Sequence, residues 1–192
     1  GLTVIEGGVV KVEDRLKGAS TRFEKVNLEV NRFDVDRPFA VIASCDNTSV
    51  IGGRTISSSL ALDAVMSLAS FDRSKAYIRA KRFAITSGGN TLRGSGAVTG
   101  LPPRQMEFEA ATPPLGTADW QWYFGKPLDF RLPAGRWRLR AEMPDPGKFR
   151  VKMLKVDAPP LSLSAFGAVE LSSAGPTVKA EVAVANFPLS KA

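Results

Sequence analysis

Strict alternation of apolar and polar residues is the feature that most constrains how this chain can fold. From Arg136 to Met143, every second residue is apolar, beginning with Trp137, and every residue between them is charged. Because side chains alternate between the two faces of a β-strand, this pattern predicts a strand with one apolar and one polar face. The alternation recurs at residues 26–31, 105–110, 161–170 and 178–184. One-sided strands are typical of antiparallel sheets, so the sequence predicts an all-β chain.

Short runs rich in glycine and proline separate the alternating segments and predict tight turns between successive strands. Their spacing is that of an antiparallel meander. The runs are Gly7-Gly8, Gly52-Gly53, Gly88-Gly89-Asn90, Pro102-Pro103, Pro144-Asp145-Pro146-Gly147, Pro159-Pro160 and Gly175-Pro176.

Two segments are less clear. The apolar residues of Ile56–Leu68 fit either a helix or a long strand, and we favour the strand. Aromatic residues cluster without alternation at residues 117–124, which favours at most a short helix near 117–125. Core packing is the favoured role of this cluster, and a lipid-facing plug or a docking surface is the alternative.

An internal repeat sets the organisation of the chain. Residues 78–98 align with residues 149–169 at an offset of 71 (149 minus 78), with matching glycines and Arg-x-Lys pairs. A three-residue insertion then changes the offset to 74 and aligns two Pro-Leu pairs (188 minus 114). We therefore predict one β-rich segment of a larger protein, with N-terminal strands at 2–46, repeat units at about 54–115 and 135–189, and an aromatic insertion at 116–132.

The composition excludes the commonest catalytic and metal-binding groups. The 192 residues include no histidine and one cysteine, Cys45, which we interpret as a small buried hydrophobic residue. The carboxylate pairs Glu107/Glu109 and Asp34/Asp36 lie on predicted solvated positions, where nothing separates their pKa values as acid–base catalysis requires. The serines at 57–59 have no histidine to activate them. We therefore expect no enzymatic activity, no cofactor and no metal site.

Two further binding classes are disfavoured. The glycines of Gly94-Ser95-Gly96 precede a predicted strand, whereas a dinucleotide loop precedes a helix. The net charge of +7 suits an anionic partner, and arginines line up at 136, 138 and 140. Because few aromatic residues share that face, we do not expect a nucleic-acid partner.

The repeat resembles the unit of the AsmA/TamB-like family of the bacterial envelope, which belongs with the bridge-like lipid transfer proteins. The resemblance is carried by Leu92–Val98 and Leu163–Val169, which follow the family's Leu-x-Gly-x-Gly-x-Val type of strand. The segment Val4–Asp14 is similar to the family's opening motif. Residues 116–132 have no counterpart in the other half and depart from the pattern.

The resemblance implies an elongated, curved, open sheet whose apolar inner face holds lipid acyl chains. It implies a periplasmic protein, with an inner-membrane anchor outside this segment, whose partners are phospholipid or another acyl lipid and other envelope proteins. The residues themselves are also compatible with a structural or protein-binding β-sandwich. A polysaccharide-active β-domain fits them less well, because the acid–base groups for catalysis are missing. The expected groove residues are Val26, Leu28, Val41, Leu60, Ile78, Met106, Phe108, Trp137, Leu139, Val151, Val182 and Val184.

Overall fold

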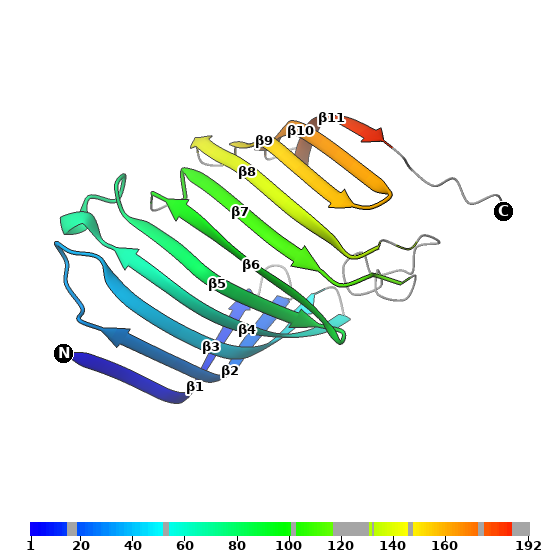
Figure 1. The fold of residues 1–192 in the computed structure, drawn as a ribbon. Coiled ribbons are helices and arrows are strands. Elements are labelled where there is room, and N and C mark those ends of the chain that lie inside the picture. The colour runs from blue at the N-terminus through cyan, green and yellow to red at the C-terminus, as the bar shows by residue number, and fades with distance from the viewer. Residues whose placement is uncertain are drawn as a thin grey trace.

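The computed structural model describes residues 1–14, 19–51, 54–100, 103–116, 131, 133–145, 148–172 and 175–185. These residues form eleven β-strands and one turn of 3₁₀ helix (Figure 1). The chain is all-β, as the alternation predicts. The elements are β1 (Leu2–Asp14), β2 (Ala19–Asn31), β3 (Phe39–Ile51), β4 (Arg54–Ser67), η1 (Ala69–Phe71), β5 (Tyr77–Ser87), β6 (Asn90–Thr99), β7 (Gln105–Thr112), β8 (Gly135–Asp145), β9 (Lys148–Ala158), β10 (Leu161–Ser172) and β11 (Gly175–Ala185).

Each strand pairs antiparallel with the next one along the chain, so the strand order in the sheet is the order in the sequence. The β5–β6 hairpin shows how local sequence sets this meander. Ser87 pairs with Asn90, and the two residues between them, Gly88 and Gly89, both have positive φ. A two-residue hairpin with positive φ at both central positions matches the twist of the flanking strands, and glycine adopts it without steric strain.

The ambiguous segment Ile56–Leu68 forms a strand. β4 pairs with β3 from Arg54, opposite Ile51, to Met66, opposite Phe39, without a register shift. The helical alternative is therefore wrong, because β3 and β5 on either side satisfy the backbone of β4 as sheet partners. The short helix expected near 117–125 lies outside the described residues.

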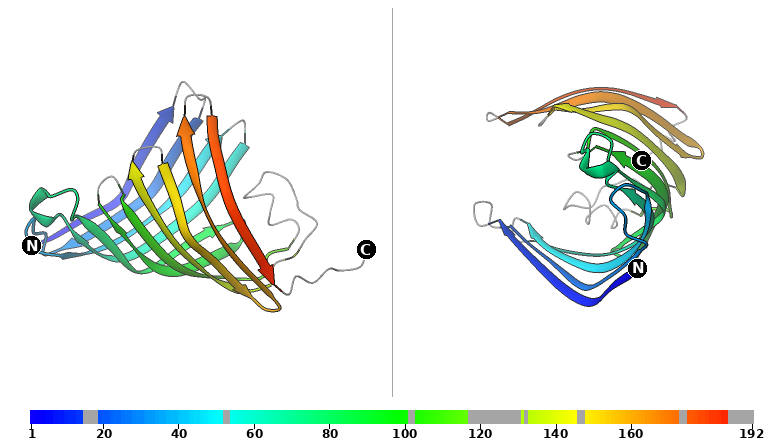
Figure 2. Two further views of the ribbon diagram at one scale, coloured as in Figure 1. Left: turned by 90° about the horizontal axis from the view of Figure 1, so that it is seen from above. Right: turned by 90° about the vertical axis from the view of Figure 1, so that its left-hand side faces the viewer.

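The sheet is a single layer. Seen end-on it curves into an open C (Figure 2, right), and extensive contacts join only strands that are neighbours in the sheet. No second sheet covers either face among the described residues, so the two-sheet sandwich is not the architecture of this part of the chain. The accessible surface is 13096 Å², whereas a compact protein of 20.6 kDa exposes about 8,900 Å². The difference indicates an open shell.

Register shifts interrupt the pairing at several points. Lys81 is an extra residue in β5, because Arg82 faces Asp63 and Ala80 faces Ala64. Lys152 is an extra residue in β9 in the same way, because Met153 faces Arg140 and Val151 faces Ala141 of β8. The two bulges are 71 residues apart (152 minus 81). Such bulges bend and twist a strand locally.

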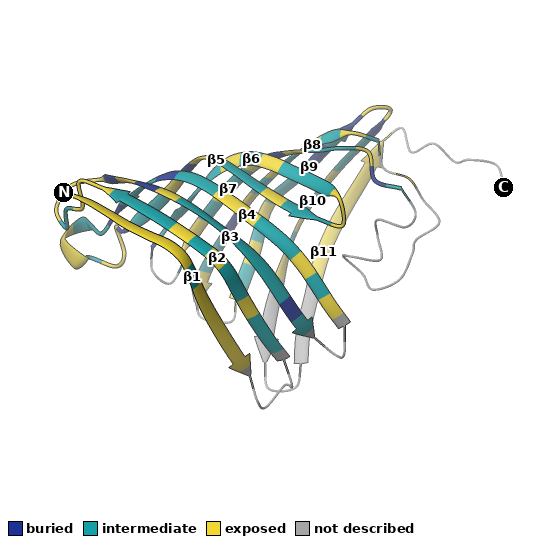
Figure 3. Cartoon of the chain, turned by 90° about the horizontal axis from the view of Figure 1, so that it is seen from below, coloured by how far each residue is buried: buried dark blue, intermediate teal, exposed yellow. Residues whose placement is uncertain are grey.

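Burial is shallow throughout the described part of the sheet. No large side chain in it is completely buried, and most of the well-buried residues are small, such as Ala64 and Ala158 (Figure 3). No helix long and apolar enough to cross a membrane occurs among the described residues.

Candidate functional site

The pairing register assigns the strand residues to two faces, because cross-strand partners project to the same side. One uncharged row can be followed through all eleven strands from partner to partner. The row is Thr3, Val30, Val41, Ala64, Ala80, Gly96, Phe108, Leu139, Leu154, Ala165 and Val182.

Glycines show that the sheet bends toward the face of this row. An added Cβ atom on Gly96 would lie 2.5 Å from the carbonyl oxygen of Glu107 on β7. On Gly167 it would lie 2.8 Å from the Cα atom of Ala180 on β11. The neighbouring backbone therefore leans over this side of the sheet, and only glycine leaves room for it. We call this side the concave face and the opposite side the convex face.

All twelve residues expected to line a groove lie on the concave face. The register places each of them on the same side as Val41, including those that follow a bulge, such as Val26 and Val151. They are Val26, Leu28, Val41, Leu60, Ile78, Met106, Phe108, Trp137, Leu139, Val151, Val182 and Val184.

The concave face is apolar but incompletely covered. Small side chains occupy the middle of the sheet, where Ala64 is 1% exposed and Ala80, Ala110 and Ala141 are also buried. Larger side chains toward the two sides of the sheet stay accessible, and Val182 is 59% exposed. Apolar area left in water is unfavourable, so this face gains free energy from any apolar molecule that covers it.

One part of the concave face is closed by a small cluster. Leu115, Val156, Ala158 and Leu161 are buried together, and Trp137, Leu154 and Leu163 pack against them. The indole Nε1 of Trp137 donates a hydrogen bond to Thr112 Oγ1 at 3.2 Å. Leu115 follows β7, so the chain crosses this part of the face before the insertion 116–132, most of which lies outside the described residues.

Uncharged polar side chains form a patch on the concave face near the β3–β4 hairpin. Thr21 and Ser49 share a hydrogen bond of 3.1 Å, Ser49 Oγ donates to Asn47 Oδ1 at 3.3 Å, and Asn47 Nδ2 donates to Ser58 Oγ at 3.4 Å. This patch was not predicted from the sequence. Its signal was present as polar residues at positions where the alternation expects apolar ones, between Val41 and Ile51.

Cys45 also lies on the concave face, opposite Leu60, and is a free thiol that is partly buried. This placement agrees with a small apolar residue in the lining. The burial is incomplete, because none of the described residues forms a second layer over the face there.

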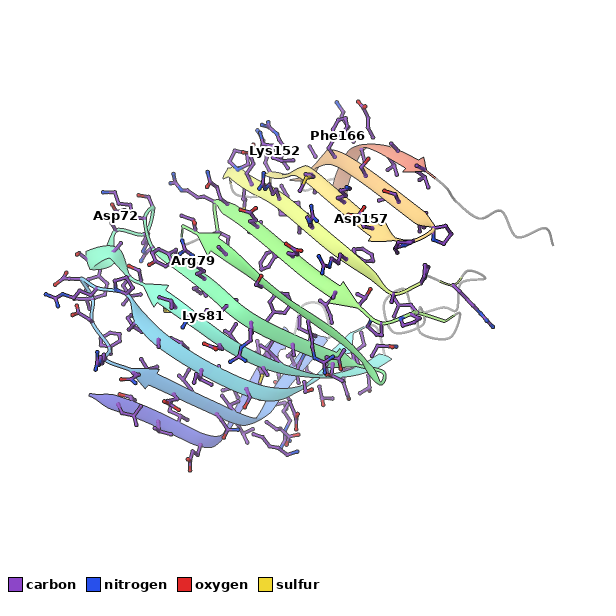
Figure 4. All side chains as sticks on the ribbon, in the orientation of Figure 1. Asp72, Arg79, Lys81, Lys152, Asp157 and Phe166 are labelled. Atoms are coloured by element: carbon purple, nitrogen blue, oxygen red, sulfur yellow. The ribbon has the colours of Figure 1, made fainter. Side chains whose placement is uncertain are left out.

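The convex face is charged. Away from the strand ends, every described charged side chain that has a register partner lies on it. Arg140 Nε donates to Glu107 Oε1 at 2.8 Å, and Arg138 lies 3.9 Å from Glu109. The Glu107/Glu109 pair is therefore exposed and ion-paired. Figure 4, which looks onto this face, labels Arg79, Lys81 and Lys152 among its cations.

A second ion-pair group on the convex face surrounds Glu142. Lys152 and Arg150 contact its carboxylate at 3.0 and 2.9 Å. The hydrogen bond from Lys152, followed by the positive charges of Lys152 and Arg150, lowers the pKa of Glu142 below its ordinary value. Two shallow hollows open on this face, and the one of about 690 Å³ is lined by Arg150, Lys152 and the exposed ring of Phe166.

The remaining carboxylates singled out in the sequence have local roles. Asp34 Oδ1 accepts hydrogen bonds from the backbone amides of Asp36 and Arg37, which closes the turn after β2. Asp36 Oδ1 accepts one from Ser70 Oγ. No group of three or more His, Cys, Asp or Glu side chains suited to a metal ion occurs in the part of the chain that the structure describes.

Comparisons with known proteins give no relative. No protein-family profile matches the chain, and neither a curated protein nor a solved structure matches it. The described residues form a single antiparallel, open sheet of eleven strands, with an apolar concave face and a charged convex face.

Proposed function

We propose that the concave face is a groove for the acyl chains of phospholipid or a related acyl lipid, and that the chain is a non-enzymatic lipid-binding or lipid-transfer module. One observation carries the proposal. An uncharged row crosses all eleven strands on the inner side of a curved sheet, and no second layer formed by the described residues lies over it. An extended apolar molecule is the ligand that such a surface fits.

The energetics favour an acyl chain. Each methylene group removed from water contributes about 0.8 kcal/mol, so about ten buried methylenes contribute about 8 kcal/mol, which is comparable with the entropic cost of binding, and a longer contact leaves net affinity. Apolar contact of this kind does not distinguish headgroups. Away from the strand ends, no described charged residue that has a register partner lies on the concave face, so we expect weak headgroup selectivity.

The resemblance to the AsmA/TamB-like family supports the same assignment and adds a location. Within the proposal, the module belongs to a periplasmic protein that is held at the inner membrane by a segment outside this chain. It moves or organises phospholipid in the envelope. The resemblance implies an open meander, and the strand pairing of the described residues is that of an open meander.

Protein binding is the second candidate function, and a specific observation favours it. The edge strand β1 exposes apolar side chains on both faces, with Leu2, Val4 and Val9 on the convex face and Ile5 and Val10 on the concave face. A long, apolar edge strand is suited to pair with a strand of another protein. In that case a strand of another polypeptide would extend the sheet beyond β1.

Adjacent residues of β11 give a matched test. Val182 lies on the concave face and Ala183 on the convex face, and both are exposed, so an aspartate at either position leaves the packing intact. We expect native mass spectrometry and lipid extraction to find phospholipid with the purified chain. Val182→Asp should reduce the lipid content, and Ala183→Asp should not.

The same pair separates the two candidate functions. Equal lipid content in the two variants, or a wild-type chain that is free of lipid and does not bind a fluorescent fatty acid, would rule out the groove. Leu60→Asp on the concave face and Ser59→Asp on the convex face provide an independent pair on β4.

A further inference from the structure

Two loops meet at one end of the sheet. The β2–β3 loop (32–38) and the β4–β5 loop (68–76) return the chain at the same strand ends, beside the N-terminus (Figure 1). The amide of Ser70 donates to the carbonyl oxygen of Val35 at 2.8 Å, and Ser70 Oγ donates to Asp36 Oδ1 at 2.7 Å. These bonds join the loops into one surface, which we call the loop tip.

The loop tip presents two phenylalanine rings to solvent. Phe71 is 72% exposed and Phe33 is 57% exposed. Phe33 is held in place by the buried ring of Phe39, with 5.1 Å between the ring centroids. Exposed single apolar side chains are common on proteins, but two phenylalanines on adjacent, mutually bonded loops form a local apolar surface that water solvates poorly.

The backbone that carries Phe71 is strained. Ala69, Ser70 and Phe71 have φ values of 48°, 55° and 66°, in the left-handed region that non-glycine residues avoid. None of the three is glycine, which would adopt this turn freely. Strain of this kind persists only where the surroundings enforce it, and it concentrates at functional sites. Here its effect is to hold Phe71 out from the sheet.

The carboxylates around the rings have hydrogen-bond or ion-pair partners, whereas the arginines have no ion-pair partner among the described residues. Asp72, labelled in Figure 4, accepts hydrogen bonds from Ser74 and contacts Lys75 at 3.2 Å. Asp34 and Asp36 are occupied by the hydrogen bonds described above. The guanidinium groups of Arg32, Arg37 and Arg73 make no ion pair among the described residues, and all three residues are exposed. The two loops carry four cations, Arg32, Arg37, Arg73 and Lys75, against three carboxylates, Asp34, Asp36 and Asp72, so their net charge is +1 (4 minus 3) and the three guanidinium groups are available to an anionic partner.

We propose that the loop tip docks on an anionic membrane surface, with Phe33 and Phe71 inserted among the headgroups and the arginines paired with lipid phosphates. Apolar rings flanked by cations are the combination that binds at a membrane interface, where hydrophobic burial and electrostatic attraction add. A nucleic acid would use the cations but gain little from isolated apolar rings on loops. This docking is independent of what the concave face holds.

Phe166 supplies a matched control. It is 54% exposed and also surrounded by cations, but it lies on the convex face of β10, away from the loops (Figure 4). The test measures co-sedimentation with vesicles of phosphatidylcholine alone and with added phosphatidylglycerol, for the wild-type chain, the double variant Phe33→Ser/Phe71→Ser, and Phe166→Ser. We expect binding only to the anionic vesicles, a loss of roughly tenfold in the double variant, and no change in Phe166→Ser.

Folding and groove binding are checked in the same samples by circular dichroism and by binding of a fluorescent fatty acid in solution. The single variant Phe71→Ser, whose ring is the more exposed, guards against a packing defect at Phe33. Membrane docking by the loop tip would be overturned by a wild-type chain that does not bind the vesicles, by retained binding in the folded double variant, or by an equal loss in Phe166→Ser. Preferential binding to single-stranded DNA over vesicles would overturn it as well.

Discussion

Gly96 on β6 faces Phe108 on β7, and the ring of Phe108 occupies the space that a Cβ atom on residue 96 would need. The carbonyl oxygen of Glu107 closes the same space from the backbone side, at 2.5 Å. The missing side chain therefore allows β7 to lean over β6. The curvature that makes the concave face depends on such positions.

The first prediction concerns this glycine. Gly96→Ala should lower the free energy of unfolding by about 1–3 kcal/mol, because the new methyl group overlaps the backbone of β7. Gly8→Ala is the matched control, since its Cβ atom would also lie on the concave face but 3.4 Å from the nearest atoms, Val26 Cβ and O. Urea unfolding of both variants measures the difference. Equal stability would show that close approach at Gly96 does not hold the bend.

The alternation alone was enough to predict which residues share a face. All twelve expected lining residues lie on the concave face because a period of two survives wherever the pairing is regular. At the bulges the period of two is broken, but the apolar residues change phase at the same point and so stay on one face. Val151 and Leu154 are three residues apart, and the extra residue Lys152 brings both onto the concave face.

The direction of bending could not be predicted from the alternation. It arises from close approaches at Gly94, Gly96, Gly135 and Gly167, which depend on how neighbouring strands lean. The pairing also refines the repeat. Phe108 faces Gly96 and Ala180 faces Gly167, an offset of 72 (180 minus 108), two residues from the offset of 74 that the Pro-Leu pairs favour. The boundaries of the two units stay a prediction.

The loop tip could not be predicted from the sequence, and the hydrogen bonds of the polar patch could not be predicted either, although its polar residues interrupt the alternation. The left-handed turn at Ala69–Phe71 contains no glycine or asparagine to signal it, and its bonds to Val35 and Asp36 span more than thirty residues of chain. The sequence does not show that β2 and β4 supply hydrogen-bond partners for Asn47 and Ser49 from both sides.

The second prediction compares packing at two ends of the concave face. Leu161→Ala should lower the free energy of unfolding by about 2–5 kcal/mol, because Leu161 is buried against Leu115, Val156 and Ala158. Val182→Ala should change it by less than about 1 kcal/mol, because this side chain is already in water. Denaturant unfolding followed by circular dichroism measures both. A large loss in Val182→Ala would mean that protein, not solvent, covers this part of the face.

The third prediction concerns the ion pairs of the convex face. A double-mutant cycle with Glu107→Gln and Arg140→Gln should give a coupling energy of about 0.2–1 kcal/mol, because both side chains of the 2.8 Å contact are largely exposed to water. The coupling should fall in high salt, which screens exposed charges. A coupling that is large and independent of salt would indicate that this face is covered in solution.

The fourth prediction is a pH dependence at the loop tip. Hydrogen bonds from the Ser74 hydroxyl, then the contact with Lys75 and the Ser74 amide, hold the pKa of Asp72 at about 2 in the folded chain. The ordinary value is 3.8, so the ionised carboxylate stabilises the fold fully above that pH. This contribution is lost as the pH falls from 3.8 to about 2.

Two variants isolate that contribution from the other carboxylates. Asp72→Asn removes it, so its unfolding midpoint should fall less than that of the wild type between neutral pH and about pH 2. Ser74→Ala removes the largest cause of the shift and should raise the pKa of Asp72 toward 3.8, which a carboxyl NMR titration measures directly. Identical acid sensitivity of the wild type and Asp72→Asn would contradict the assignment.

The last prediction uses Cys45 as a reporter of the groove. Because Cys45 is the single cysteine of the chain and lies partly exposed on the concave face, a thiol reagent reads the accessibility of that face directly. A bound fatty acid should slow the reaction several-fold. The control moves the thiol by one residue, in Cys45→Ser/Ser44→Cys, which places it on the convex face opposite Asn27. There the fatty acid should leave the rate unchanged, and equal protection at both positions would mean that the ligand acts by tightening the whole sheet rather than by filling the groove.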